Sequence, residues 1–153
     1  MKSMPKEDLE LAKSHLFDEG SSLVIVKKGK VIFETKKQGI TGFLEAIETF
    51  EEKLVSSSIA DKIVGVAAAM LCVYSGISSV FAITISESGM KLLKENNIQY
   101  EFSKKVKKIL NRNKTNVCPF EKLAMNSINP ENAYQNLKSF ANQISKKSKV
   151  SEC

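Results

Sequence analysis

Three predicted helix starts carry the side chains of this sequence that could do chemistry. A helix N-terminus offers free N–H groups and a positive dipole end to anions, and ligands of open α/β sheets gather at the carboxyl ends of strands. The three starts read Ser58-Ile59-Ala60-Asp61-Lys62, Ser86-Glu87-Ser88-Gly89 and Cys118-Pro119-Phe120-Glu121. Together they predict a pocket suited to a small anionic ligand.

The first two starts each have a structural and a functional interpretation. Ser58 and Asp61 have the spacing of a capping box, and Ser86 is a suitable N-cap for the helix that follows it. Functionally, Lys62 is the only basic residue near the head of a very apolar predicted helix, so it could contact a phosphate group. Ser86 could instead donate a hydrogen bond to a ligand at the end of the preceding strand.

The third start places a thiol where it could be reactive. Pro119 at the first helical position puts Cys118 at the N-cap, where the helix dipole and the nearby Arg112 and Lys114 would lower the pKa of the thiol. Glu121, three residues further on, would bond back to the cap. The alternatives are a reactive or ligand-contacting thiolate and an ordinary capped helix with an inert thiol.

Residue counts exclude several other kinds of chemistry. The chain has 153 residues, three widely spaced cysteines and one histidine, His15. An odd cysteine number without a C-x-x-C pair argues against a disulfide framework and against a zinc site, so we expect neither metal nor cofactor. No glycine-rich phosphate loop is present. A Ser-His-Asp hydrolase would depend on His15, which falls on a predicted N-terminal helix.

The elements that must position these side chains follow from hydrophobic periodicity. Helices are predicted over residues 5–19, 42–54, 59–74, 87–95, 119–127 and 130–145, and strands over 22–26, 31–35, 79–84 and 98–102. The first two strands form a hairpin, and helical crossovers predict that the last two are parallel. The sequence therefore predicts an α/β protein, a three-layer α/β/α sandwich with a mixed sheet.

Charge is unevenly distributed along the chain. The net charge is +6, but residues 1–99 sum to −1 and residues 100–153 sum to +7. The lysine-rich stretch 103–117, with Tyr100 and Phe102 just before it, could bind nucleic acid. A single arginine and the lack of an RNA-binding signature favour a solvated surface instead, so nucleic acid is a disfavoured partner.

The uncharged run 63–86 raises the question of a membrane span. Ser75, Gly76, Ser78 and Ser79 interrupt the run, and a β-rich segment follows. This pattern favours a buried helix, a turn and a strand over a bilayer-spanning helix, which needs about 20 apolar residues. With a charged N-terminus and few cysteines, the chain is expected to be cytoplasmic, with no membrane partner.

The order of elements and the helix-start residues resemble a bacterial family of unknown function that has a cytidine-deaminase-like fold. The matching stretches are LVIVKKGKVIFET at 23–35, QGI at 38–40, ADKIVGVAAAML at 60–71, ISESGMKLL at 85–93 and NRNKTNVCPFE at 111–121. The resemblance implies a deaminase-like domain over 21–128. An N-terminal helix within 1–20 would pack on this domain, a C-terminal helix would span 129–145, and a basic disordered tail would span 146–153.

The sequence departs from zinc deaminases where their chemistry is located. Those enzymes carry His or Cys, then x-Glu, at one helix start and Pro-Cys-x-x-Cys at the next. The corresponding stretches here read Asp61-Lys62-Ile63 and Ser86-Glu87-Ser88. Zinc-dependent deamination is therefore not expected, and the resemblance implies a zinc-free pocket.

The sequence thus predicts a protein that binds a nucleotide or another phosphorylated ligand at the carboxyl ends of its strands. In this hypothesis Lys62 and Arg112 hold phosphate, and Asp61 or Cys118 is the reactive group if a reaction occurs. Hydrogen bonds to a ribose or base would come from Ser86, Glu87 and Asn111. The full candidate set is Asp61, Lys62, Ser86, Glu87, Asn111, Arg112, Cys118 and Glu121.

Two alternative functions belong to other classes. One is a zinc-independent enzyme that uses Cys118 as its nucleophile. The other is a nucleic-acid-binding or scaffold protein that acts through its basic C-terminal third. A homo-oligomer is compatible with any of the three functions.

Overall fold

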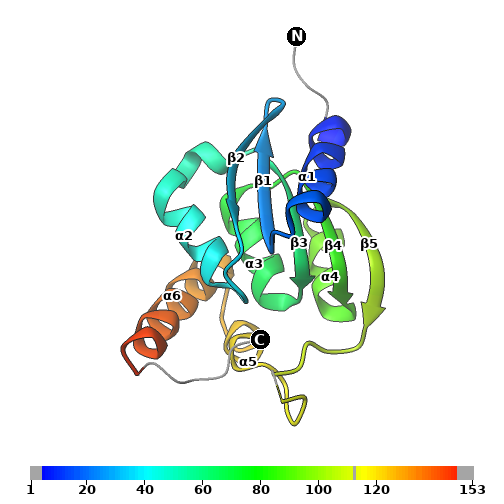
Figure 1. Cartoon of the computed structure of the whole chain (residues 1–153). Helices are drawn as coiled ribbons and strands as arrows, with labels where there is room; N and C mark the ends of the chain where they lie inside the picture. The colour runs from blue at the N-terminus through cyan, green and yellow to red at the C-terminus, as the bar shows by residue number, and fades with distance from the viewer. Residues whose placement is uncertain (1–4, 112, 148–153) are drawn as a thin grey trace.

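A mixed five-stranded sheet organises the computed structural model, which describes residues 5–111 and 113–147 (Figure 1). The elements in chain order are α1 (Pro5–Glu19), β1 (Leu23–Lys27), β2 (Lys30–Thr35), α2 (Thr41–Phe50), the 3-10 turn η1 (Glu51–Leu54), β3 (Ser58–Val64), α3 (Val66–Ser75), β4 (Ser79–Ser86), α4 (Glu87–Glu95), β5 (Gln99–Val106), α5 (Pro119–Met125) and α6 (Pro130–Lys147).

The sheet has the strand order β2-β1-β3-β4-β5. β1 is antiparallel to both β2 and β3, whereas β3, β4 and β5 run parallel to one another. The parallel strands are connected by α3 and α4, as crossover connections require. Their carboxyl ends consequently lie along one end of the sheet, which is the lower end in Figure 1.

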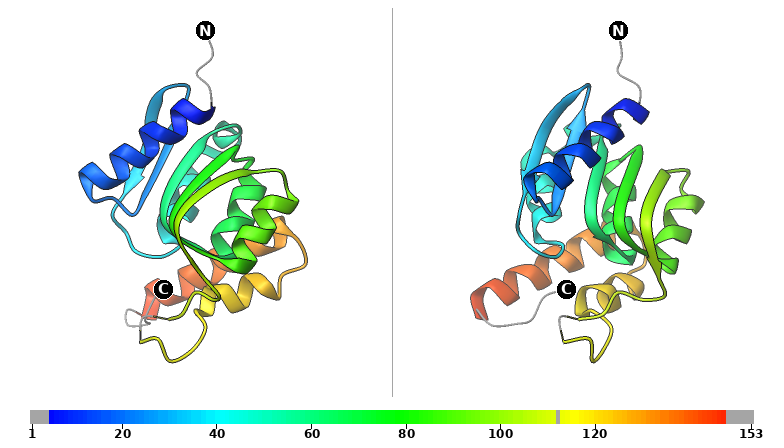
Figure 2. Two further views of the ribbon diagram at one scale, coloured as in Figure 1. Left: turned by 90° about the vertical axis from the view of Figure 1, so that its right-hand side faces the viewer. Right: turned by 45° about the vertical axis from the view of Figure 1, so that its right-hand side comes forward.

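Helices cover the sheet unequally on its two faces (Figure 2). On one face α1 packs Leu9, Ala12 and Leu16 against apolar side chains of β1, β3 and β4. On the other face the larger core joins α2, α3, α4, α5 and α6 to the sheet. The α/β class and the mixed sheet predicted from the sequence are therefore confirmed.

The predicted helix over 59–74 is wrong in its first half. Residues 58–64 form the central strand β3, and the helix α3 begins only after Gly65. Ser58 caps no helix there, because its hydroxyl lies 2.7 Å from the hydroxyl of Ser79 on β4, and Asp61 and Lys62 lie in a strand. Residues 58–60 are buried one after another without alternation, and such a run looks alike in a central strand and in a buried helix.

The other elements agree with the sequence to within a few residues. The hairpin, the N-terminal helix and the helices after Ser86, Cys118 and Asn129 are confirmed. The last strand continues to Val106, and α6 continues to Lys147 rather than ending at 145. The predicted disorder of the tail falls mostly on residues 148–153, which lie outside the described residues. None of the helices in the described part of the chain has the length and apolar character that crossing a bilayer requires.

The starts of α3 and α4 approach each other closely. The Ser86 hydroxyl accepts a hydrogen bond of 2.9 Å from the Gly89 backbone N–H, so the predicted cap of α4 is confirmed. Gly89 is buried against Gly65, and a Cβ placed on it would lie 2.9 Å from the Gly65 carbonyl carbon and oxygen. Backbone atoms cannot yield as a flexible side chain can, so this contact requires glycine.

Replacing Gly89 with alanine tests this contact. Alanine favours a helix over glycine by about 1 kcal/mol, but the clash should outweigh this gain, and Gly89→Ala should lower the free energy of unfolding by about 1–3 kcal/mol. Ser88→Ala, at the exposed neighbouring position, should change the free energy by less than about 0.5 kcal/mol. Urea unfolding of both variants measures the difference, and a stabilised Gly89→Ala would contradict the close approach.

Candidate functional site

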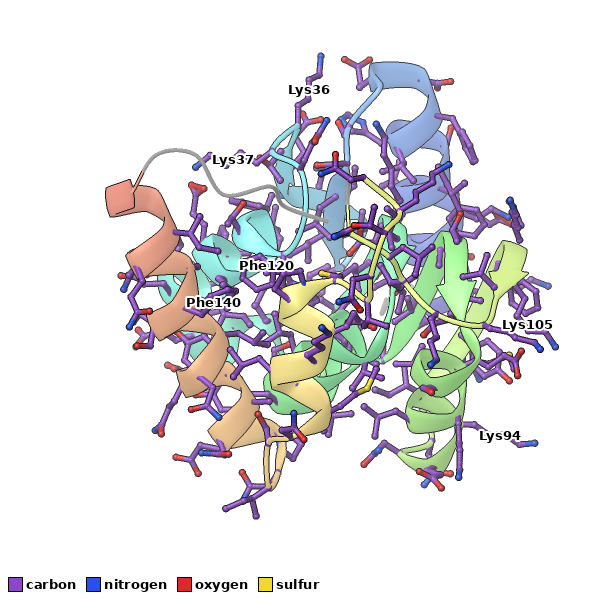
Figure 3. All side chains as sticks on the ribbon, turned by 90° about the horizontal axis from the view of Figure 1, so that it is seen from below. Lys36, Lys37, Lys94, Lys105, Phe120 and Phe140 are labelled. Atoms are coloured by element: carbon purple, nitrogen blue, oxygen red, sulfur yellow. The ribbon has the colours of Figure 1, made fainter. Side chains whose placement is uncertain are left out.

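A cavity of about 280 Å³ lies at the carboxyl end of β3. Figure 3 looks onto this end of the sheet, with Phe120 of α5 near the middle of the view and Lys36 and Lys37 above it. The cavity is bounded by the loop after β2, the end of β3, the first turn of α3 and the start of α5. Its lining residues are Ser22, Gln38, Gly39, Ile40, Asp61, Lys62, Ile63, Gly65, Ala67, Ala68, Ile109, Cys118, Phe120 and Glu121.

Asp61 brings a carboxyl group into the cavity wall. Its position on β3 is fixed by pairing with Leu23 of β1 on one side and Ala82 of β4 on the other. The side chain is partly buried, and its Oδ1 accepts a hydrogen bond of 3.2 Å from the Ile63 backbone N–H. Burial raises the pKa of the Asp61 carboxyl to about 7, because the nearby backbone N–H groups offset only part of the desolvation.

Glu121 links α5 to the start of α3 through hydrogen bonds at the site. Its two carboxylate oxygens accept hydrogen bonds from the backbone N–H groups of Val66 and Ala67, each 2.7 Å long. The residue is only 3% exposed. Burial raises the pKa of the Glu121 carboxyl, although the two N–H groups act in the opposite direction. The carboxylate thus occupies the free N–H groups at the start of α3, where an anionic ligand would be expected.

The expectation that Glu121 bonds back to its own helix cap is wrong. The partners are on α3, 54 and 55 residues earlier in the chain. Gly65 makes this approach feasible, since a Cβ at this position would fall on the Glu121 carboxyl group. Cys118 does lie at the N-cap of α5, followed by Pro119 at the first helical position, as predicted, but its side chain makes no capping hydrogen bond. Its sulfur is held in a disulfide bond, so the structure does not present the free thiol that the hypothesis of a Cys118 nucleophile requires, and the expectation of a chain without disulfides is wrong at this position.

The structure brings half of the predicted site residues together. Asp61, Lys62, Cys118 and Glu121 line the cavity, with Lys62 exposed at the rim and Cys118 only 1% exposed. The other four are not among the described lining residues. Ser86 ends β4 and caps α4, and Glu87 is the first residue of α4. Asn111 holds a turn through two hydrogen bonds with Thr115, and Arg112 lies outside the described residues.

Several lining residues were not singled out by their chemistry in the sequence. The segment Gln38, Gly39 and Ile40 belongs to a stretch that carried the family resemblance, and this was its only signal. Ser22 reaches the site because β1 pairs with β3, where the Lys62 backbone N–H donates to the Ser22 carbonyl at 3.0 Å. That pairing could not be anticipated while residues 59–64 were interpreted as a helix.

The arrangement combines an apolar enclosure with a few polar groups. Most of the surface of the wall is apolar, whereas Asp61, Lys62, Ser22 and Gln38 add hydrogen-bonding groups. The chemistry of the donors does not fit a zinc ion, since the described residues contain no group of three His, Cys, Asp or Glu side chains placed to hold a metal. Such a cavity suits a small organic molecule with a polar edge.

Two comparisons place the chain beside known proteins. A sequence model of the family described as a domain of unknown function (DUF1893) matches residues 11–141. A solved structure of a DUF1893 family protein from Thermotoga maritima is similar with a TM-score of 0.81 and 27% identity, over 91% of this chain and 93% of that chain. No protein with a curated description matches the chain in sequence.

Weaker structural similarity extends to deaminases. A dCMP deaminase from the cyanophage S-TIM5 has a TM-score of 0.45 and 12% identity, over 67% of this chain and 96% of that chain. A diaminohydroxyphosphoribosylaminopyrimidine deaminase/5-amino-6-(5-phosphoribosylamino)uracil reductase from T. maritima has the same score and 17% identity, over 93% of this chain and 40% of that chain.

Replacing Glu121 tests how strongly its carboxylate holds α5 against α3. The Gln side chain of Glu121→Gln has one acceptor oxygen and would turn its NH₂ group toward the second N–H of α3. We expect the free energy of unfolding to fall by about 1–3 kcal/mol. Glu95→Gln, at an exposed position on α4, is the control. Equal stability of the two variants in urea unfolding would contradict the assignment.

A second prediction concerns the pH dependence that Asp61 imposes. The folded pKa of about 7 lies above the ordinary value of 3.8, so this group destabilises the folded state as pH rises from about 4 to about 7. Asp61→Asn should therefore become more stable relative to the parent protein over that range. For a fully buried carboxyl, this shift in pKa would change the free energy of unfolding by at most about 4 kcal/mol, and the partial exposure of Asp61 reduces this figure.

Urea unfolding of the parent protein and of Asp61→Asn at pH 4.5, 6 and 8 measures this effect. Asp18→Asn, which removes an exposed carboxylate from α1, should show no such trend. A stability difference for Asp61→Asn that stays constant with pH would show that the carboxyl titrates normally in the folded protein.

Proposed function

We propose that this chain, which belongs to the DUF1893 family, binds a nucleoside or nucleotide in the cavity at the carboxyl end of β3. The membership confirms the resemblance to a family of unknown function on which the sequence-based expectation rested. The observation that carries the proposal is the lining of the cavity, an apolar enclosure into which a small set of polar groups converges.

The size and walls of the cavity suit the base of such a ligand. Its volume of about 280 Å³ lies just below the range of about 300–1,000 Å³ that small-molecule sites occupy. Ile40, Ala67, Ala68 and Phe120 provide apolar surface from three different segments. A planar heterocycle fills such a space better than a flexible chain, because it loses little conformational freedom on binding.

Asp61 would recognise the polar edge of the base. A carboxyl with a pKa of about 7 exists in both protonation states near neutral pH. It can therefore donate one hydrogen bond and accept another, whereas an ionised carboxylate only accepts. Nucleobases present neighbouring donors and acceptors on one edge, so a protonated Asp61 matches them better than a point charge would.

The sequence-based expectation places the phosphate at a helix start, with Lys62 as one of its partners. The start of α3 is already occupied by the Glu121 carboxylate, so a second anion is disfavoured there. We place the phosphate of a nucleotide at the rim, beside the exposed side chain of Lys62. Lys36 and Lys37 stand at the same end of the molecule (Figure 3), and Lys37 is also held by Glu45 at 2.8 Å.

Thermal unfolding with a panel of nucleobases, nucleosides and nucleotides tests the proposal. A ligand at one hundred times its Kd adds about 2.7 kcal/mol to the free energy of unfolding, which raises the midpoint by several degrees. Ala68→Leu should abolish this shift, because the larger side chain fills the cavity. Lys62→Met should weaken the binding of nucleotides more than that of the matching nucleosides. Lys94→Met, on the exposed side of α4, should change the binding of neither.

The proposal fails if no member of the panel shifts the midpoint of the parent protein. It also fails if Ala68→Leu, shown to be folded by circular dichroism, binds as tightly as the parent protein in isothermal titration calorimetry. An equal loss of nucleoside and nucleotide affinity in Lys62→Met would contradict the placement of the phosphate.

A further inference from the structure

The strand β5 forms an edge of the sheet and is exposed over most of its length. Residues 101–105 are all exposed, although α1 contacts Glu101 through Lys13 on one face and α4 packs against the strand. The strand order ends at β5, and no described segment pairs with its outer edge (Figure 1). Unpaired N–H and C=O groups along an open edge form a template for another strand.

The sequence of this edge is complementary to itself. In an antiparallel pair related by a two-fold axis at Ser103, each residue faces the one at the same distance beyond the axis in the other copy. Glu101 then faces Lys105 of the partner subunit, and Lys105 faces the partner's Glu101. Opposite charges directly across two strands stabilise their pairing, and the symmetry makes each pair occur twice.

The side chains of β5 are sorted by face in a way that this register preserves. Glu101, Ser103 and Lys105 alternate onto the face that carries α1, where Lys13 of α1 donates to Glu101 at 3.1 Å. Tyr100 and Phe102 lie on the other face, with ring centroids 6.4 Å apart. Phe102 is 40% exposed.

The same register gives the aromatic face a partner as well. It places Lys104 of the partner subunit across from Phe102, within the reach of a cation–π contact. Both faces of the strand would thus gain favourable contacts in a single arrangement.

We propose that two copies of this chain associate through antiparallel pairing of their β5 strands, with Ser103 on the two-fold axis, into one continuous sheet. The inference is independent of the ligand proposed above, since no residue of the cavity lining lies on β5. One strand per copy buries little surface, so the dimer is expected to be weak and its fraction to rise with protein concentration.

The opposite edge of the sheet does not offer the same pairing. Lys30 and Glu34 on β2 have the same spacing as Glu101 and Lys105. The Glu34 carboxylate, however, has two partners at 2.9 Å within its own copy, since it accepts from Ser21 and contacts His15, whereas Glu101 accepts from Lys13 at 3.1 Å. The ladder between β1 and β2 is also irregular at Ile25 and Val26. This edge therefore provides a matched control.

Sedimentation of the full chain over a range of concentrations tests the proposal without any ligand. Glu101→Lys and Lys105→Glu each create two like-charge pairs across the axis, and each should raise the dimer Kd about tenfold or more. The double variant Glu101→Lys/Lys105→Glu restores opposite charges in reversed order. Its dimer Kd should return to within about threefold of the parent value.

Lys30→Glu is the control on β2 and should leave the dimer Kd unchanged. Circular dichroism confirms that each variant is folded, which matters for Glu101→Lys because it also loses the contact with Lys13. A parent protein that stays monomeric at the highest concentration overturns the proposal. The proposal is also overturned if the double variant dimerises as weakly as the single variants, or if Lys30→Glu dimerises as weakly as Lys105→Glu.

Discussion

The carboxylate of Glu121 at the start of α3 is the contact on which the site depends. It joins α5 to the first turn of a helix that lies in the centre of the larger core, through two hydrogen bonds of 2.7 Å in a buried environment. A buried carboxylate is tolerated only when its oxygens are satisfied, and here the two N–H groups that α3 cannot use internally satisfy them. The contact fixes Phe120 and Cys118 as a wall of the cavity, and it requires a glycine at position 65.

The two carboxyl groups of the cavity have different roles because of this contact. Glu121 accepts hydrogen bonds from the backbone of α3, so the most favourable position for an anion is not open to the ligand. Burial raises the pKa of both carboxyls, but Asp61 lies in the cavity wall with a longer hydrogen bond of 3.2 Å from the Ile63 N–H, and its pKa is raised to about 7. One group is therefore a structural anchor and the other a hydrogen-bonding group of adjustable protonation. The polar part of a ligand should be recognised by Asp61, and any phosphate should remain at the rim.

Local signals in the sequence predicted local structure well, and the failures involve distant partners. Ser86 caps α4 because its partner, Gly89, is three residues away. The partners of Glu121 are more than 50 residues away, so a rule based on spacing assigned it to the wrong helix. The sequence predicts a helix over 59–64 because Ser58 and Asp61 have the spacing of a capping box. Only the pairing with β1 and β4 on both sides makes this segment a strand, and such long-range pairing has no signature in a short window.

The structure also changes the interpretation of the positive charge in the last third of the chain. In sequence, Lys104 and Lys105 are part of one basic run that could contact a nucleic-acid backbone. In β5 successive side chains point to opposite faces, so the two ammonium groups cannot line a single groove. Glu101 and Phe102 alternate in the same manner, and each therefore shares a face with one of these lysines. Such an edge strand has acidic, aromatic and basic residues at even spacing. It is therefore more complementary to an antiparallel copy of itself than to the uniformly negative backbone of a nucleic acid.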